Sequence, residues 1–181
     1  MSGPLRIVIT PEEIGEREAA DISRWLDEGW DYVHLRHPEA SLRDMRRLIE
    51  AIPQRHHRRL RLHGHFHLAS EFNLGGLHLN GRCPAPPAFY SGALSRSCHS
   101  VAEVREAAGQ CDYVTLSPIF DSISKKGYRS AFTASMLEEL NDIARPLVIA
   151  LGGVTPDRLA ELKRFNFAGY AVKGAIDLFK Q

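Results

Sequence analysis

Short apolar runs rich in Val, Ile and Leu recur along the whole chain and predict β-strands that are buried on both faces. Each run is too short for a buried helix and is followed by polar residues, glycine or proline. Eight strands are predicted in this way, at residues 5–10, 32–36, 60–65, 76–80, 94–99, 113–120, 146–153 and 169–176.

The segments between most of these strands have the period of an amphipathic helix. Residues 16–29 place Ile22, Trp25 and Leu26 on one side, which predicts a helix there. The same reasoning predicts helices at residues 41–52, 100–108, 133–144 and 155–165, and a helix that has begun by His67. Three of the helices open with an expected N-cap, Ser41, Ser100 or Thr155, and Pro156 follows in a first-turn position.

Alternation of strands and helices with short connections indicates right-handed βαβ units, and eight of them most simply form an α/β protein with a compact (β/α)8 TIM barrel. A doubly wound open sheet is the alternative, but the first strand is followed by "TPEE" and not by a GxGxxG motif. Residues 80–92 contain three prolines and leave little room for a full helix. A truncated last helix is expected after the eighth strand, and a homo-oligomer could cover the sides left open.

Composition favours one domain over residues 1–181 and a small ligand. The chain is 44% hydrophobic, and its 23 Lys and Arg residues nearly balance its 22 Asp and Glu residues, for a net charge of +1. This balance gives no reason to expect nucleic acid as a partner. Without a long apolar run, neither a membrane span nor a signal peptide is predicted, and a cytoplasmic location is expected. Cys83, Cys98 and Cys111 lack metal-site spacing and are expected to be reduced thiols.

Glycines at the ends of the last two strands indicate an anion site. Functional groups of a TIM barrel gather at the carboxyl ends of its strands, and phosphate commonly binds at the loops after strands seven and eight. Gly152 and Gly153 follow the predicted seventh strand, and Gly174 lies in the eighth. Exposed backbone N–H groups there could bind a phosphorylated substrate, whereas the simpler alternative is that these glycines only form turns.

The loop after the sixth strand, "DSISKKG", has the groups to bind a second anion. Ser122 and Ser124 offer hydroxyl donors, and Lys125 with Lys126 supplies positive charge. A solvated turn is the alternative interpretation.

The segment "HGHFH" supports a different hypothesis. If residues 63–67 were a strand, then His63, His65 and His67 would share one face and could bind zinc, as in barrel hydrolases. The helix expected from His67 onward argues against this arrangement.

Several motifs together resemble the thiamine-phosphate synthase/TenI family. They are "VHLRH", "GLHLNG", "SRSCHS", "DYVTLSPIF" followed by "SISKKG", "PLVIALGGVTPDRL" and "GYAVKGAI". The resemblance implies a TIM barrel that binds thiazole phosphate at strands seven and eight. In the synthases of the family, a pyrimidine pyrophosphate also binds through magnesium.

The resemblance also assigns roles to individual positions. Arg36 matches the arginine of a family motif and is a candidate for pyrophosphate binding in catalysis. The positions expected to bind substrate and phosphate are Ser97, Ser122, Ser124, Lys125, Gly152, Gly153 and Gly174.

Other positions depart from the synthase pattern. His34 and Pro38 stand where synthases carry Gln and Lys, and His63 and Gly64 replace an Asn-Asp pair. The segment "LNGRCPAP" has no acidic residue where a metal ligand is expected. Magnesium prefers oxygen ligands, so magnesium is expected as a cofactor only if the protein is a synthase.

TenI-type proteins instead tautomerise the thiazole phosphate to its aromatic form, which requires an acid/base group and no metal. Their histidine next to the end of the sixth strand is replaced here by Ser117 and Pro118. His37 and His63 are the candidate acid/base groups, while His78 and His99 are expected to pack or to orient neighbours. Tautomerase-type chemistry is therefore favoured, with a magnesium-dependent synthase and a non-catalytic thiamine-phosphate-binding regulator as the alternatives.

Overall fold

The computed structural model describes residues 3–120, 132–173 and 176–179. Its hydrogen-bonded strand order is that of a closed barrel in which β1 to β8 follow one another in sequence. The strands are parallel, and helical segments follow most of them. The predicted (β/α)8 TIM barrel is confirmed.

The chain divides into two compact parts. One part is Ile7–Leu94, and the other combines Met1–Arg6 with Ser95–Gln181. That residues 1–181 form a single domain stays a prediction.

The first part contains the strands near whose carboxyl ends Arg36, His37, His63 and His78 lie. Its elements are β1 (Leu5–Ile9), α1 (Glu18–Asp27), β2 (Tyr32–Leu35), α2 (Leu42–Ala51), the 3-10 helix η1 (Gln54–Arg59), β3 (Leu60–Leu62), α3 (His67–Glu71) and β4 (Gly76–Leu79). Val33 pairs with Val8 on one side and with Leu60 on the other, and Leu62 pairs with Leu77. Buried aliphatic side chains therefore hold these strands in one register.

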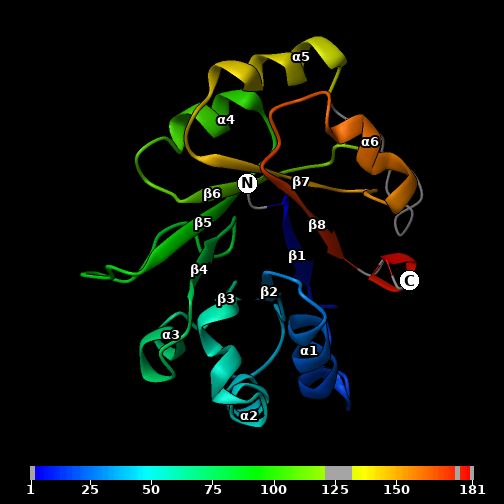
Figure 1. The fold of residues 1–181 in the computed structure, drawn as a ribbon. Coiled ribbons are helices and arrows are strands. Elements are labelled where there is room, and N and C mark those ends of the chain that lie inside the picture. Colours follow the sequence, from blue (N-terminus) through cyan, green and yellow to red (C-terminus); the bar gives the residue numbers. More distant parts are fainter. Residues whose placement is uncertain (1–2, 121–131, 174–175, 180–181) are drawn as a thin grey trace. The chain divides into compact units, whose positions relative to one another are not determined.

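The second part repeats the same pattern with shorter helices. Its elements are β5 (Ala93–Cys98), α4 (Val101–Glu106), β6 (Tyr113–Leu116), α5 (Ala134–Glu138), η2 (Glu139–Asp142), β7 (Leu147–Leu151), η3 (Pro156–Arg158), α6 (Leu159–Leu162), β8 (Gly169–Lys173) and η4 (Ile176–Phe179). Cys98, Leu116 and Ala150 are neighbours in register at the carboxyl ends of β5, β6 and β7. Helix α4 and the α5–η2 segment lie side by side and are joined by an ion pair between Arg105 and Glu139 (Figure 1).

The predicted strands begin within one residue of the observed ones, but those predicted at residues 60–65 and 113–120 end early, at Leu62 and Leu116. All eight strands are present, and Ser41 and Ser100 cap their helices by accepting hydrogen bonds from backbone N–H groups. Thr155 occupies the predicted position but forms no side-chain cap, and η3 begins at Pro156. The segment between β4 and β5 contains no helix, as expected. Within the described ranges, no helix combines the length and apolarity that crossing a membrane requires.

The basic segment before β3 is partly buried. Within η1, the side chains of His56 and His57 lie away from solvent. The ring of His57 lies between the carbonyl oxygens of Ile52 and Phe72, at 2.9 and 3.1 Å. These two contacts connect the end of α2 to the end of α3 through the His57 ring. They explain why this histidine is buried in a basic segment.

Candidate active site

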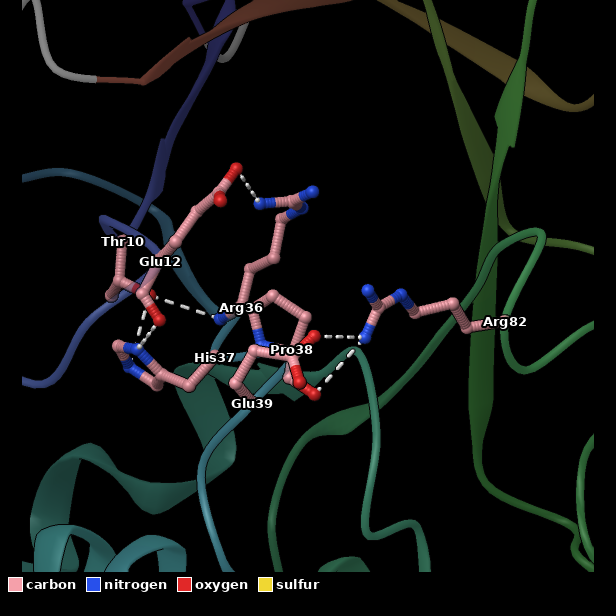
Figure 2. Close-up of polar contacts among 7 residues, drawn as sticks. All are labelled: Thr10, Glu12, Arg36, His37, Pro38, Glu39 and Arg82. Carbon is pink, nitrogen blue, oxygen red and sulfur yellow. Dashed lines mark hydrogen bonds and ion pairs between the residues drawn. The ribbon is translucent and has the colours of Figure 1, made fainter.

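Arg36 is held at the carboxyl end of β2 by residues that follow β1. Its guanidinium donates to Glu12 at 2.8 Å, and its backbone N–H donates to Thr10 Oγ1 at 2.9 Å (Figure 2). The Arg36 side chain is about one-third exposed, at 35%. The arginine thus lies at the end of a strand, as predicted. One of its nitrogens is hydrogen-bonded to Glu12, a carboxylate that the sequence alone did not indicate.

His37 is closed off from solvent. Its Nε2 lies 2.7 Å from Glu18 Oε1 and 3.2 Å from Thr10 Oγ1, and its Nδ1 lies 3.4 Å from the Glu12 carbonyl oxygen. The His37 side chain is 0% exposed and that of Glu18 is 4% exposed. Glu18 Oε2 also accepts from the Gly15 N–H. This geometry suits a residue that fixes the loops after β1 and β2 better than one that meets a substrate.

His63 belongs to a cluster of three histidines from adjacent strands. His63 Nε2 lies 2.9 Å from His34 Nδ1, so one proton is shared between these two rings. The ring of His63 stacks on that of His78, with centroids 4.2 Å apart and planes at 21°. His34 and His78 are buried, whereas His63 is half-buried. The expectation that His78 packs against its neighbours is confirmed.

Burial keeps this cluster in its neutral form. Desolvation lowers the pKa of His78 to about 3. Desolvation, followed by the neighbouring His78, also lowers the pKa of His34 and of His63 well below 6.5. Three imidazoles can therefore lie together near neutral pH without mutual repulsion.

The neutral cluster predicts acid sensitivity. Unfolded His78 titrates near 6.5 and folded His78 near 3, so at pH values between them the unfolded chain binds more protons. Above about pH 6.5 the neutral His78 does not lower the free energy of unfolding. As the pH falls below that value the free energy of unfolding should decrease, by about 2 kcal/mol from His78 alone at about pH 5. Urea unfolding in metal-free buffer should show a steeper pH dependence for the wild type than for His78→Gln. Parallel curves would contradict this assignment.

The predicted HxHxH face does not form. Strand β3 ends at Leu62, and His65 has a positive φ of 49° with its Nε2 2.9 Å from the Ala40 carbonyl oxygen. His67 is exposed as the first residue of α3. The hypothesis of a zinc site made by His63, His65 and His67 is therefore wrong, because the chain turns before it can present all three to one face.

The glycine loop after β7 lies against the end of β6. Gly152 and Gly153 have φ values of 98° and 62°, which a glycine adopts without strain. The Phe120 N–H donates to the Gly152 carbonyl at 3.0 Å, and Arg158 donates to the Gly153 carbonyl at 3.1 Å. Of the other predicted phosphate residues, Ser97 is a half-buried residue of β5. Ser122, Ser124, Lys125 and Gly174 lie outside the described residues.

Gly152 should not tolerate a side chain. A Cβ there would lie 2.9 Å from Pro118 Cα, and the positive φ adds strain for any other residue. Gly152→Ala should lower the free energy of unfolding by about 1–3 kcal/mol. The matched control is Gly81→Ala, because nothing lies within 4 Å of a Cβ at Gly81. Chemical unfolding of both variants would refute the prediction if their losses were equal.

His99 reaches the end of the sixth strand, which sequence reasoning did not foresee. Its Nδ1 lies 3.0 Å from the Ser117 carbonyl oxygen, and the ring is exposed. The backbone N–H of His99 donates to Glu103 at 2.7 Å, beside the Ser100 cap of α4. With Nδ1–H donated to a carbonyl, Nε2 is left as the basic nitrogen. The sequence could have indicated this contact, because His99 directly follows the predicted strand next to the sixth one.

The three cysteines are free thiols, as predicted. Cys98 precedes His99, but desolvation raises its pKa to about 12. Cys98 is thus a protonated core residue and not a nucleophile.

Comparison with known proteins identifies the family. Residues 5–176 match the family model described as thiamine monophosphate synthase. The chain belongs to the thiamine monophosphate synthase family. A crystal structure of thiamine phosphate pyrophosphorylase from Bacteroides thetaiotaomicron is 41% identical, with a TM-score of 0.84 over 94% of this chain and 83% of that chain.

A more distant solved structure agrees in fold, and a curated relative matches part of the sequence. Thiamine phosphate pyrophosphorylase from Pyrococcus furiosus is 19% identical, with a TM-score of 0.79 over 95% of this chain and 86% of that one. The thiamine-phosphate synthase of Anoxybacillus flavithermus is 33% identical over 46% of this chain. The matched segment spans only 39% of that relative's length.

Proposed function

We propose that this protein acts on a thiazole phosphate in thiamine biosynthesis and tautomerises it by metal-independent proton transfer. The observation that carries the proposal is the position of His99. In the TenI-type proteins that the sequence resembles, a histidine stands next to the end of the sixth strand. Here His99 comes from the end of β5, and its ring is bonded to the backbone of Ser117, the residue after β6.

His99 also lies close to the proposed phosphate loop. Ser117 is followed by Pro118, whose Cα lies next to Gly152, and the Ile119 N–H donates to the Leu151 carbonyl at 2.9 Å. A phosphate bound by the N–H groups of the β7 loop would place its organic group within reach of an imidazole on this side. In this mechanism, His99 Nε2 takes a proton from one position of the thiazole ring and returns it to another, so that the histidine ends as it began.

His63 and His37 remain proposals for the same role. His63 is half-exposed, but its Nε2 is engaged by His34. His37 is buried, and Glu18 occupies its Nε2. On these contacts His99 is the stronger candidate, while Arg36 and the loop of Ser122, Ser124 and Lys125 are proposed to bind further anionic groups of a ligand.

The residues where the resemblance places magnesium do not fit that ion. In the described parts of the chain, the grouping able to hold a metal consists of His34, His63 and His78, and it includes no carboxylate. Magnesium needs hard oxygen ligands in near-octahedral geometry. The proposed tautomerisation therefore uses no magnesium.

A magnesium-dependent synthase is the second candidate, because the 41%-identical relative is a thiamine phosphate pyrophosphorylase. This reaction would join a pyrimidine pyrophosphate to the thiazole phosphate and release pyrophosphate. The resemblance to the synthases implies pyrophosphate binding for Arg36 and, separately, for Ser122, Ser124 and Lys125.

The deciding experiment follows both reactions with the same protein. The non-aromatic thiazole phosphate is incubated in D2O with a chelator, and NMR monitors aromatisation and deuterium uptake. The proposal predicts catalysed conversion that the chelator does not affect. Product formation only from the pyrimidine and thiazole pair with magnesium would overturn it in favour of a synthase. Binding of thiamine phosphate without either reaction would favour the non-catalytic regulator.

A further inference from the structure

The three-histidine cluster of the first part has the composition of a transition-metal site. His34, His63 and His78 each offer one ring nitrogen, and these nitrogens all lie within 4.8 Å of one another. Neutral imidazole is the common nitrogen ligand of zinc, at about 2.0–2.1 Å from the ion. Two such ligands in tetrahedral geometry lie roughly 3.3 Å apart. His34 Nδ1 and His63 Nε2, at 2.9 Å, would move slightly apart to reach this spacing, and nitrogens up to 4.8 Å apart would move closer together.

Three adjacent parallel strands set the positions of the three histidines. His34 lies in β2 and His78 in β4, while His63 follows directly after β3 between them. The parallel register aligns Leu35 with Leu62 and Leu62 with Leu77, so His63 and His78 are the next residues in line. Ligands on neighbouring strands are fixed more rigidly than ligands on loops.

Asn80 further fixes the two later ligands. Its Nδ2 donates to the backbone carbonyls of His63 and His78, at 2.9 and 3.0 Å. Its Oδ1 accepts from the N–H groups of Arg82 and Cys83. These bonds fix the backbone at two of the three ligand positions.

We propose that His34, His63 and His78 bind a divalent transition-metal ion of the zinc class, with a fourth position open on the half-exposed side of His63. The ion would replace the proton that His34 Nδ1 and His63 Nε2 now share at 2.9 Å. Three histidines and an open position are the donor set of catalytic zinc. The site differs in ligand chemistry from a magnesium site, because it consists of nitrogen donors.

The surrounding charge specifies what the fourth ligand would be. Among the described residues the cluster contains no carboxylate, and its three imidazoles are neutral ligands. A divalent ion bound by neutral ligands keeps its full charge, so an anion such as hydroxide or phosphate would complete the site.

Zinc titration of the untagged, metal-free, full-length protein tests the proposal. In competition with a chromophoric chelator, the wild type should bind one Zn²⁺ per chain. His63→Gln and His78→Gln should each weaken binding by about 100-fold or more. His67→Gln is the matched control, because His67 is an exposed histidine of the same part, and this variant should bind like the wild type. Equal affinities for all four proteins would overturn the site.

A second measurement uses only the wild type, so the result does not depend on how the variants fold. X-ray absorption of the zinc-loaded protein should show nitrogen or oxygen neighbours with histidine scattering. Sulfur neighbours would overturn the proposal, because they would assign the ion to a cysteine such as Cys83. Neither measurement includes a substrate, so the metal site and the proposed reaction can fail independently.

Discussion

Replacing His99 with Gln is expected to lower turnover of the thiazole phosphate by about 10²–10⁴-fold, the usual contribution of a general acid/base. Glutamine retains a donor for the Ser117 carbonyl but cannot take up a proton at neutral pH. Because His99 is exposed, the free energy of unfolding should change little. Steady-state kinetics should show the loss in kcat, while KM changes less because the phosphate loop is untouched.

His63→Gln is the matched comparison for this prediction. It removes a second imidazole at the end of a strand, from the cluster with His34 and His78. If His63→Gln abolished turnover and His99→Gln did not, the proton transfer would belong to His63. Similar small losses in both variants would remove acid/base catalysis by either histidine.

Replacing Glu18 with Ala should cost about 1–3 kcal/mol of folding free energy, the scale for leaving buried hydrogen-bonding groups without their partner. Within the described chain, His37 is the group that reaches Glu18 Oε1, at 2.7 Å, and both side chains are almost completely buried. Alanine would leave the His37 ring without that partner and the Gly15 N–H without its acceptor. Urea unfolding measures the loss directly.

The contrast with an exposed pair makes this prediction specific. Arg82 and Glu39 are 2.7 Å apart in the same part of the chain, but their side chains are 66% and 81% exposed (Figure 2). Glu39→Ala should therefore cost at most about 1 kcal/mol. A Glu18→Ala loss no greater than that of Glu39→Ala would show that solvent or rearrangement replaces the buried pair.

The hydrophobic pattern and the capping residues predict the strands and helix starts of this barrel well, because both depend on interactions between residues close in sequence. Runs such as 146–153 can only be buried strands when helices separate them, and Ser41 and Ser100 mark helix starts by hydrogen bonds within one turn. Pattern fails where tertiary contacts decide. The predicted strand at 60–65 stops at Leu62, since the contact of His65 with Ala40 depends on a distant loop.

The candidate site shows the same division. The glycines after β7 could be predicted from their position at the end of a strand, and Arg36 from the resemblance. Glu18 could not, because it reads as an ordinary first-turn acid of α1 until its contact with His37 is known. His34, His63 and His78 are 44 residues apart from first to last, and only parallel pairing brings their rings together.

The amide of Asn80 decides which residue this position can accept. One nitrogen spans two carbonyls, and one oxygen receives two backbone N–H groups. Aspartate has nearly the same shape and would satisfy the two N–H groups, yet it would present a negative oxygen to two carbonyl oxygens. Replacing the NH2 group of Asn80 with O⁻ would thus turn two hydrogen bonds between the ends of β3 and β4 into repulsive contacts, with almost no change in side-chain volume.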